Sequence, residues 1–122
     1  MMDRKSGAIV NVSSVAGRNG GALGSIHYST AKGGLITFTK GLAKEMAAYN
    51  VRVNAVSPGV IQTHFHEQFS TPEMMQAYCK NIPLGRVGTP REVADVVCFL
   101  SSESANFLVG ETIEINGGML ME

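Results

Sequence analysis

Two short runs of apolar and β-branched residues, separated by a long segment of helical periodicity, limit the folds that this chain can adopt. The runs are residues 7–14 (GAIVNVSS) and 51–57 (VRVNAVS). In the first run Ile9, Val10 and Val12 stand nearly adjacent instead of alternating strictly with polar residues, which is typical of a parallel strand covered on both faces. Parallel neighbours need a crossover connection, and a helix between the runs supplies it. We therefore expect an α/β fold with a parallel sheet.

The segment between the two runs predicts a helix over residues 25–49. Apolar side chains recur there at spacings of three and four residues, which places them on one helix face. These side chains are Tyr28, Ala31, Leu35, Phe38, Leu42 and Met46. Gly33 and Gly34 each weaken a helix by about 1 kcal/mol relative to alanine, so we expect another segment, such as a second helix, to pack very closely beside them. Asn50 suits the left-handed residue that ends a helix.

The remainder of the chain predicts helices followed by one more strand. Thr71-Pro72 and Thr89-Pro90 each combine a capping threonine with a proline at the first helical position. Residues 111–116 (ETIEIN) alternate polar and apolar side chains like a strand, and the glycine-rich residues 15–25 predict a loop. Right-handed crossovers then give a three-stranded parallel sheet with helices on its faces.

Composition argues against several classes of function. The charges of ten basic and ten acidic residues cancel, so the sequence has no excess of positive charge that would predict a nucleic-acid partner. No segment has the length of a membrane span and the first residues lack the apolar stretch of a signal peptide, which predicts a cytoplasmic protein that does not bind a membrane. Cys79 and Cys98 form no CxxC pair and are typical of reduced thiols. His64 and His66 supply too few ligands for a zinc site, so no metal is predicted.

Tyr28 and Lys32 stand four residues apart, which places a phenol and an ammonium on one helix face. On its own the pair is more typical of a half-buried tyrosine beside a solvated lysine. A nearby cation, however, favours the ionised phenol, and such a tyrosine can exchange a proton with a carbonyl or carbinol oxygen. Ser13 and Ser14 follow the preceding strand, at the edge where open α/β sheets place their ligands. A hydroxyl at that edge could hydrogen-bond the same oxygen.

Four motifs, in this order, resemble those of the short-chain dehydrogenase/reductase family. They are NVSS at residues 11–14, YxxxK at residues 28–32, VNAVSPG at residues 53–59 and GETIEINGG at residues 110–118. The likeness is nearest to bacterial 3-oxoacyl-carrier-protein reductases and to sugar, polyol and steroid dehydrogenases of the same type. The resemblance implies the C-terminal portion of a Rossmann-like doubly wound parallel sheet. Residues 1–122 would then form a partial domain, without the N-terminal dinucleotide-binding half.

The resemblance also implies catalytic roles. Tyr28 corresponds to the family's acid/base and Lys32 to the lysine that assists this tyrosine and hydrogen-bonds the nicotinamide ribose. Ser14 corresponds to the serine that polarises the substrate carbonyl, and Ser13 is the weaker candidate of the two serines. These correspondences imply hydride transfer between a nicotinamide and a carbonyl carbon, with Tyr28 handling the proton.

Four further residues correspond to the family's nicotinamide site. Pro58 and Gly59 match the turn beneath the ring, while Ile61 and Thr63 match the positions that meet its carboxamide. The cofactor would be NAD or NADP, which this sequence does not distinguish, because the GxGxxG turn and the residue that reads the adenosine ribose belong to the half not found here. Residues 60–83 correspond to a lid over a small carbonyl or alcohol substrate, whose identity stays open.

Two functions are compatible with these patterns. The first is an NAD(P)-dependent oxidoreductase, and the second is a truncated, non-catalytic remnant that associates with full-length homologues. The resemblance implies a dimer or tetramer formed through the helix over residues 25–49 and the C-terminal strand. One edge of the strand over residues 7–14 would lack a neighbour, so we expect a marginally stable chain that is prone to associate.

Overall fold

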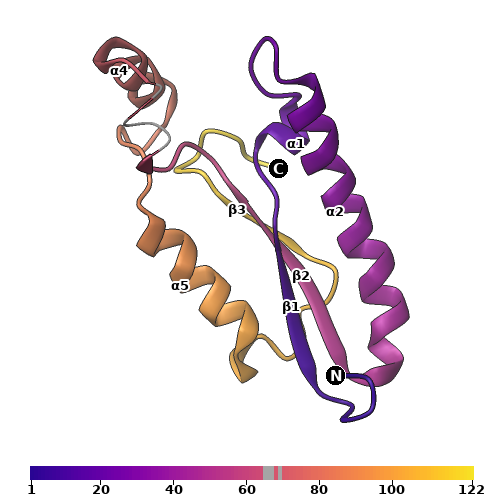
Figure 1. Cartoon of the computed structure of the whole chain (residues 1–122). Coiled ribbons are helices and arrows are strands. Elements are labelled where there is room, and N and C mark those ends of the chain that lie inside the picture. Colours follow the sequence, from indigo (N-terminus) through magenta and orange to yellow (C-terminus); the bar gives the residue numbers. More distant parts are fainter. Residues whose placement is uncertain (65–67, 69) are drawn as a thin grey trace.

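The structure, a computed structural model, describes residues 1–64, 68 and 70–122. Its centre is a three-stranded parallel sheet in the order β1-β2-β3, formed by β1 (Gly7–Val12), β2 (Val51–Pro58) and β3 (Thr112–Ile115). Helix α2 (Ile26–Met46) lies on one face of the sheet and helix α5 (Pro90–Ser101) on the other (Figure 1). The predicted arrangement of three parallel strands with helices on both faces is confirmed.

Shorter helices connect these elements. A 3-10 helix, η1 (Ala47–Tyr49), extends α2, and a second 3-10 helix, η2 (Glu103–Ala105), follows α5. Helix α4 (Pro72–Asn81) lies within the predicted lid, residues 60–83. Asn50 ends η1 with a φ of 53°, which confirms the predicted left-handed residue. None of the helices in the described part of the chain is both long and apolar enough to cross a membrane.

The loop predicted over residues 15–25 is wrong in its first part, which forms the short helix α1 (Ala16–Asn19). The hydroxyl oxygen of Ser14 accepts a hydrogen bond of 3.2 Å from the backbone N–H of Ala16, so a serine turn starts the helix. Gly20 ends the helix with a φ of 87°, a left-handed conformation that favours glycine. Because glycine is frequent in this segment, the sequence predicted a loop throughout and the short helix was missed.

The core on the α5 side of the sheet is apolar. Val56 of β2 packs there with Leu100 of α5 and Ala105 of η2, and all three are at most 1% exposed. Partly buried valine, leucine and isoleucine side chains from β1, α5, the loop before β3 and β3 itself surround this cluster. These residues account for most of the apolar periodicity in α5.

Helix α2 packs on the opposite face of the sheet through a mixture of polar, small and apolar residues. Its buried positions are Ser29, Ile36, Thr39 and Ala43. The hydroxyl of the fully buried Thr39 donates to the carbonyl oxygen of Leu35 at 2.8 Å and accepts from the side-chain amide of Asn11 on β1 at 2.9 Å. The apolar side chains that share one predicted face are more exposed, with Phe38 at 56%. The most apolar stripe of this helix is therefore not the one that contacts the sheet.

A buried amide on β2 sets the register of β3. Asn54 is 1% exposed, and its side-chain N–H donates to the carbonyl oxygen of Leu108 at 2.8 Å. Its side-chain oxygen accepts from the backbone N–H of Glu111 at 3.0 Å. These two bonds hold the turn that enters β3, so that Thr112 lies opposite Ala55.

Both predicted helix starts are confirmed by side-chain caps. The hydroxyl of Thr71 accepts from the N–H of Met74 at the start of α4, and Thr89 and Glu92 form a reciprocal capping box at the start of α5. Glu92 also accepts from both terminal nitrogens of Arg86, at 3.0 and 2.6 Å. The hydrogen bond from Arg86, together with those from Thr89, lowers the pKa of Glu92 from 4.5 to about 2.

Leu100→Ala is expected to destabilise the chain by about 2–5 kcal/mol, because it opens a cavity at a site that is 0% exposed. The free energy of unfolding from urea titrations, followed by circular dichroism, measures this change. Leu23→Ala is the matched control, since Leu23 is fully exposed and its truncation should change stability by less than about 0.5 kcal/mol. Equal losses in the two variants would contradict the assignment of the core.

Glu92 is expected to make the stability of α5 depend on pH. Because its pKa is lowered in the folded chain, its contribution is fully present above pH 4.5 and is lost as the pH falls towards about 2. The stability difference between the wild type and Glu92→Gln should therefore shrink over this interval in pH-dependent urea titrations. Since the pair is exposed, 1 M NaCl should weaken the effect. A difference that stays constant with pH would contradict the ionic role of Glu92.

Candidate active site

The predicted catalytic residues and the Pro58-Gly59 turn lie at the carboxyl edge of the sheet, where the ends of β1 and β2 are joined by backbone hydrogen bonds. The N–H of Ser13 donates to the carbonyl oxygen of Val56 at 2.8 Å, and the N–H of Val15 donates to that of Pro58 at 3.0 Å. Ser14 thus lies between two anchored residues, next to the turn that begins at Pro58. The first two turns of α2 bring Tyr28 and Lys32 to the same edge (Figure 1).

The ammonium of Lys32 is held beside the ring of Tyr28. Its Nζ donates to the carbonyl oxygen of Val12, the last residue of β1, at 2.8 Å. The same nitrogen lies 5.7 Å from the centroid of the Tyr28 ring. Tyr28 itself is 44% exposed, so a small molecule can reach its phenol. An ammonium has three N–H donors, and the bond to Val12 uses one of them.

The two serines of the NVSS motif lie in different environments. Ser13 is 3% exposed, and its hydroxyl donates to the carbonyl oxygen of Lys32 at 2.8 Å. Ser14 is only partly buried, and its hydroxyl oxygen accepts from the N–H of Ala16. A hydroxyl has one hydrogen to donate. Ser13 uses its hydrogen to fasten β1 to α2, whereas the bond to Ala16 leaves the hydrogen of Ser14 for a bound oxygen.

A close backbone contact joins α1 to α2 at the position of Lys32. A Cβ atom at Gly17 would lie 2.7 Å from the backbone carbon of Lys32 and 2.8 Å from the backbone nitrogen of Gly33. A Cβ atom at Gly33 would in turn lie 3.0 Å from the carbonyl oxygen of Gly17. The expected close neighbour of Gly33 is therefore the short helix α1, whereas a Cβ at Gly34 would meet nothing within 4 Å.

The Pro58-Gly59 turn packs directly against the end of β3. A Cβ atom at Gly59 would lie 2.8 Å from the Cβ of Asn116, and the N–H of Gly59 donates to the carbonyl oxygen of Ile115 at 2.9 Å. Ile61 follows the turn and pairs with Gly88 in a parallel bridge. This arrangement fixes the floor of the candidate nicotinamide site.

The lid segment is described only in part. Thr63 is exposed just beyond the bridge at Ile61, so its predicted contact with the carboxamide stays a prediction. His66, the second histidine considered above, lies outside the described residues. In the described ranges, no group of three or more His, Cys, Asp or Glu side chains could hold a metal ion.

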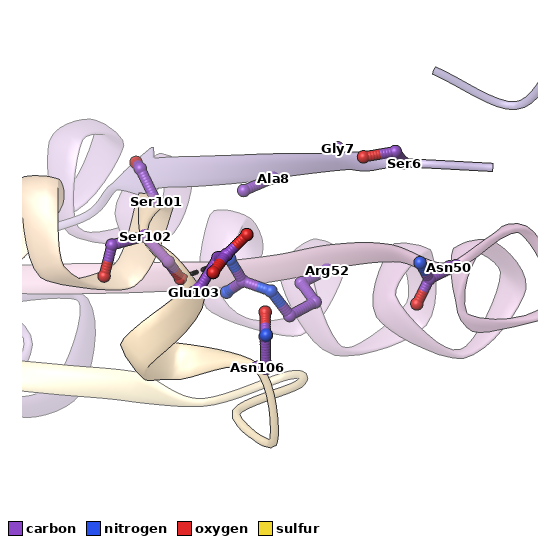
Figure 2. A pocket seen from close by; sticks show the side chains of 9 residues that line it. All are labelled: Ser6, Gly7, Ala8, Asn50, Arg52, Ser101, Ser102, Glu103 and Asn106. Carbon is purple, nitrogen blue, oxygen red and sulfur yellow. Dashed lines mark hydrogen bonds between the residues drawn. The ribbon is translucent and has the colours of Figure 1, made fainter. Parts of the chain in front are cut away.

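One of two hollows beside the described part of the sheet borders the candidate site. The smaller, of about 260 Å³, adjoins the Pro58-Gly59 turn and is lined by Val60, Ile61 and Asn116, among others. The larger, of about 440 Å³, lies at the amino ends of β1 and β2 (Figure 2). There Arg52 donates to the carbonyl oxygens of Leu100 and Ser102 at 2.6 and 2.9 Å, so its guanidinium caps the C-terminal end of α5. This second hollow is remote from Tyr28.

Sequence reasoning missed Arg18 and Glu114, which link α1 to β3. The Nε of Arg18 lies 3.1 Å from Oε1 of Glu114. A basic residue in the glycine-rich segment and an acidic residue in the closing strand were visible as separate features. Nothing in one sequence pairs residues that lie so far apart along the chain.

Gly17→Ala is expected to destabilise the chain by about 1–3 kcal/mol, because its methyl group would overlap the backbone at Lys32 and Gly33. Gly34→Ala is the matched control on the open side of α2, and it should stabilise the helix by up to about 1 kcal/mol. Urea titrations of both variants measure the two changes. If both substitutions shifted stability in the same direction, the α1–α2 contact would not be the constraint described.

The chain is similar to known reductases over nearly its whole length. A family model described as enoyl-(acyl carrier protein) reductase matches residues 1–120. The 3-oxoacyl-[acyl-carrier-protein] reductase of Aquifex aeolicus is 54% identical over 119 residues, which cover 98% of this chain and 47% of that protein. The corresponding reductase of Vibrio harveyi is 45% identical over 121 residues, or 99% of this chain and 49% of that protein.

Two solved structures from Brucella melitensis share the fold. A short-chain dehydrogenase/reductase described as a glucose/ribitol dehydrogenase superposes with a TM-score of 0.88 at 38% identity, covering 94% of this chain and 46% of its own. A 3-oxoacyl-[acyl-carrier protein] reductase gives a TM-score of 0.90 at 40% identity, covering 100% of this chain and 45% of its own. The chain spans about half the length of the curated relatives it matches. With its motifs, fold and relatives in agreement, the chain belongs to the short-chain dehydrogenase/reductase family.

Proposed function

We propose that this chain carries the proton-transfer part of an NAD(P)-dependent oxidoreductase that reduces a carbonyl or oxidises a secondary alcohol. The observation that supports this most strongly is the position of the Lys32 ammonium. It is tied to the end of β1 and lies 5.7 Å from the Tyr28 ring centroid, beside the turn that holds Ser14. Relatives named as 3-oxoacyl-[acyl-carrier-protein] reductases support the same class of reaction.

Tyr28 would act as the acid and base of the reaction. In the direction of reduction, its phenol O–H would give a proton to the substrate oxygen while the carbonyl carbon accepts a hydride. The positive charge of Lys32 would stabilise the negative charge that develops on the phenol oxygen as the proton leaves. The hydroxyl of Ser14 would donate a hydrogen bond to the same substrate oxygen and orient it towards Tyr28. Oxidation of an alcohol would use the same groups in reverse.

The residues at the carboxyl edge also fit a nicotinamide cofactor, which when bound would supply or accept the hydride. The tight turn at Pro58 and Gly59 offers a flat floor, since the contact of Gly59 with Asn116 excludes any side chain there. Lys32 would use a remaining N–H to bind a ribose hydroxyl. Ile61 and Thr63 would lie along the carboxamide side. The described residues favour neither NAD nor NADP.

We further propose that the chain acts in the cytoplasm as part of a homo-oligomer. The side chain of Phe38 on α2 supports self-association, because it is 56% exposed and a partner chain would cover it. Burial of such a side chain in an interface is favourable. The C-terminal strand β3 has one neighbour in the described sheet and would supply a second contact.

A second candidate function is association without catalysis, as a remnant that joins full-length homologues. It is favoured by one specific observation, the outer edge of β1, which pairs with no strand in the part of the chain that the structure describes. An unpaired parallel edge offers hydrogen-bonding groups to another chain. Under this function Tyr28 and Lys32 would be present but unused.

Tyr28→Phe is expected to lower kcat for reduction of a β-ketoester or an acetoacetyl thioester by at least about 100-fold, since it removes the transferred proton. Tyr49→Phe, in η1 beyond the end of α2, is the matched control and should retain wild-type kcat. Steady-state consumption of NADH or NADPH measures the rate, and the change in cofactor fluorescence on titration measures binding. Co-purification with a full-length homologue, without cofactor binding by the chain itself, would favour the non-catalytic function instead.

A further inference from the structure

We propose that Arg18 is a positioning residue that couples the two walls of the candidate active site. One wall is the turn of Ser14 with Lys32 behind it, and the other is the Pro58-Gly59 turn. The inference rests on the proposed function for its catalytic meaning, although the coupling itself is a property of the fold. The pathway from one wall to the other runs through Arg18, Glu114 and Asn116.

Arg18 is rigidly connected to the first wall. It lies in α1, whose backbone N–H groups return to the residues after β1, with Gly17 donating to Ser14 at 2.9 Å and Arg18 donating to Val15 at 3.0 Å. The contact of Gly17 with Lys32 leaves no room for a side chain between α1 and α2. A displacement of Arg18 therefore displaces the backbone on both sides of Ser14 and presses on that of Lys32.

Glu114 and Asn116 connect Arg18 to the second wall. Oε1 of Glu114 lies 3.1 Å from Nε of Arg18, and its other oxygen, Oε2, accepts from the side-chain amide of Asn116 at 3.3 Å. Asn116 is 9% exposed, and its Cα and Cβ lie against Gly59. The same carboxylate thus contacts a cation that belongs to one wall and an amide that belongs to the other.

A second carboxylate fixes the orientation of the guanidinium. Nη1 of Arg18 lies 2.9 Å from Oε2 of Glu122. The residues before Glu122 fold back onto Asn116, which donates to the carbonyl oxygen of Leu120 at 2.9 Å and accepts from the N–H of Gly118 at 3.0 Å. Arg18 therefore contacts β3 through Glu114 and the segment after β3 through Glu122. Asn116 hydrogen-bonds to both of these parts of the chain as well.

Burial separates this ion pair from the other ion pairs on the surface of the chain. The side chains of Arg18 and Glu114 are 23% and 19% exposed, whereas those of Arg91 and Asp95 on α5 are 84% and 60% exposed. Exposed pairs of the second kind contribute little to stability. Removing one partner from a largely buried pair instead leaves a charge without compensation, so the surrounding backbone must adjust. Lysine would keep the charge at position 18 but could not contact two carboxylates in the same planar geometry.

Amide hydrogen exchange of the full 15N-labelled chain tests the coupling directly. Arg18→Met should accelerate exchange about tenfold at Gly17, at Gly20 and, across the site, at Gly59, because each of these amides bonds to backbone that the network holds. Arg91→Met is the matched control, since it removes an ion pair of the same type from an exposed site, and it should leave these three amides unchanged. Acceleration at Gly17 and Gly20 without any at Gly59 would overturn the proposal.

Glu114→Gln provides a second route to the same result if Arg18→Met does not fold. It retains the shape of the side chain and removes its charge, and it should accelerate the same three amides. The double variant Arg18→Glu, Glu114→Arg reverses the pair and should restore much of the protection lost in Arg18→Glu alone. Additive effects of the two substitutions would mean that the residues act independently and would overturn the proposal.

Steady-state reduction assays measure the effect of Arg18 on catalysis. Arg18→Met should lower kcat about tenfold with little change in KM. The kcat of Arg18→Lys should fall between those of Arg18→Met and the wild type, and the kcat of Arg91→Met should equal that of the wild type. A normal kcat in Arg18→Met, despite faster exchange at Gly59, would overturn the positioning role. If the wild type neither binds cofactor nor turns over, the proposed function fails, and the exchange pattern alone then decides whether Arg18 couples the two walls.

Discussion

The arrangement of the candidate site depends on one steric constraint, the contact of Gly17 with the backbone of Lys32 and Gly33. Because no side chain separates the two helices there, α1 lies directly on α2, and the serine turn before α1 is brought to the lysine of α2. Ser13 completes the same junction by donating to the carbonyl oxygen of Lys32. A methyl group at this point would have to move either the hydroxyl of Ser14 or the ammonium, and the chemistry proposed here needs both in place.

The interface of α2 with the sheet combines buried side chains with hydrogen bonds to β1. Thr39 of α2 accepts from Asn11 of β1, beside the buried Ile36 and Ala43 of the helix. On the opposite face α5 packs on an apolar core around Leu100. Since Lys32 also bonds to the last residue of β1, the helix that carries the candidate catalytic residues is tied to that strand at two points.

Local signals in the sequence predicted much of this structure. Short runs rich in β-branched residues marked β1 and β2, threonine-proline pairs marked both later helices, and Asn50 marked the end of η1, which extends α2. The face of α2 that packs on the sheet was not predicted, because periodicity identifies apolar stripes and the buried positions of this helix include Ser29, Thr39 and Ala43 beside Ile36. Helix α1 was missed since its glycines also suit a loop. The bond between Arg18 and Glu114 depends on tertiary structure, so only the fold reveals it.

Asn54 illustrates how narrowly one buried group can limit the choice of residue. Its side chain donates on one side, to Leu108, and accepts on the other, from Glu111. Aspartate at this position would offer two acceptors and would face the Leu108 carbonyl oxygen with a negative charge, while leucine would leave both backbone groups without their partner. An amide is the group that matches a donor and an acceptor at once. The entry of the chain into β3, and hence the location of Glu114 and Asn116, is therefore specified by the polarity of a single side chain.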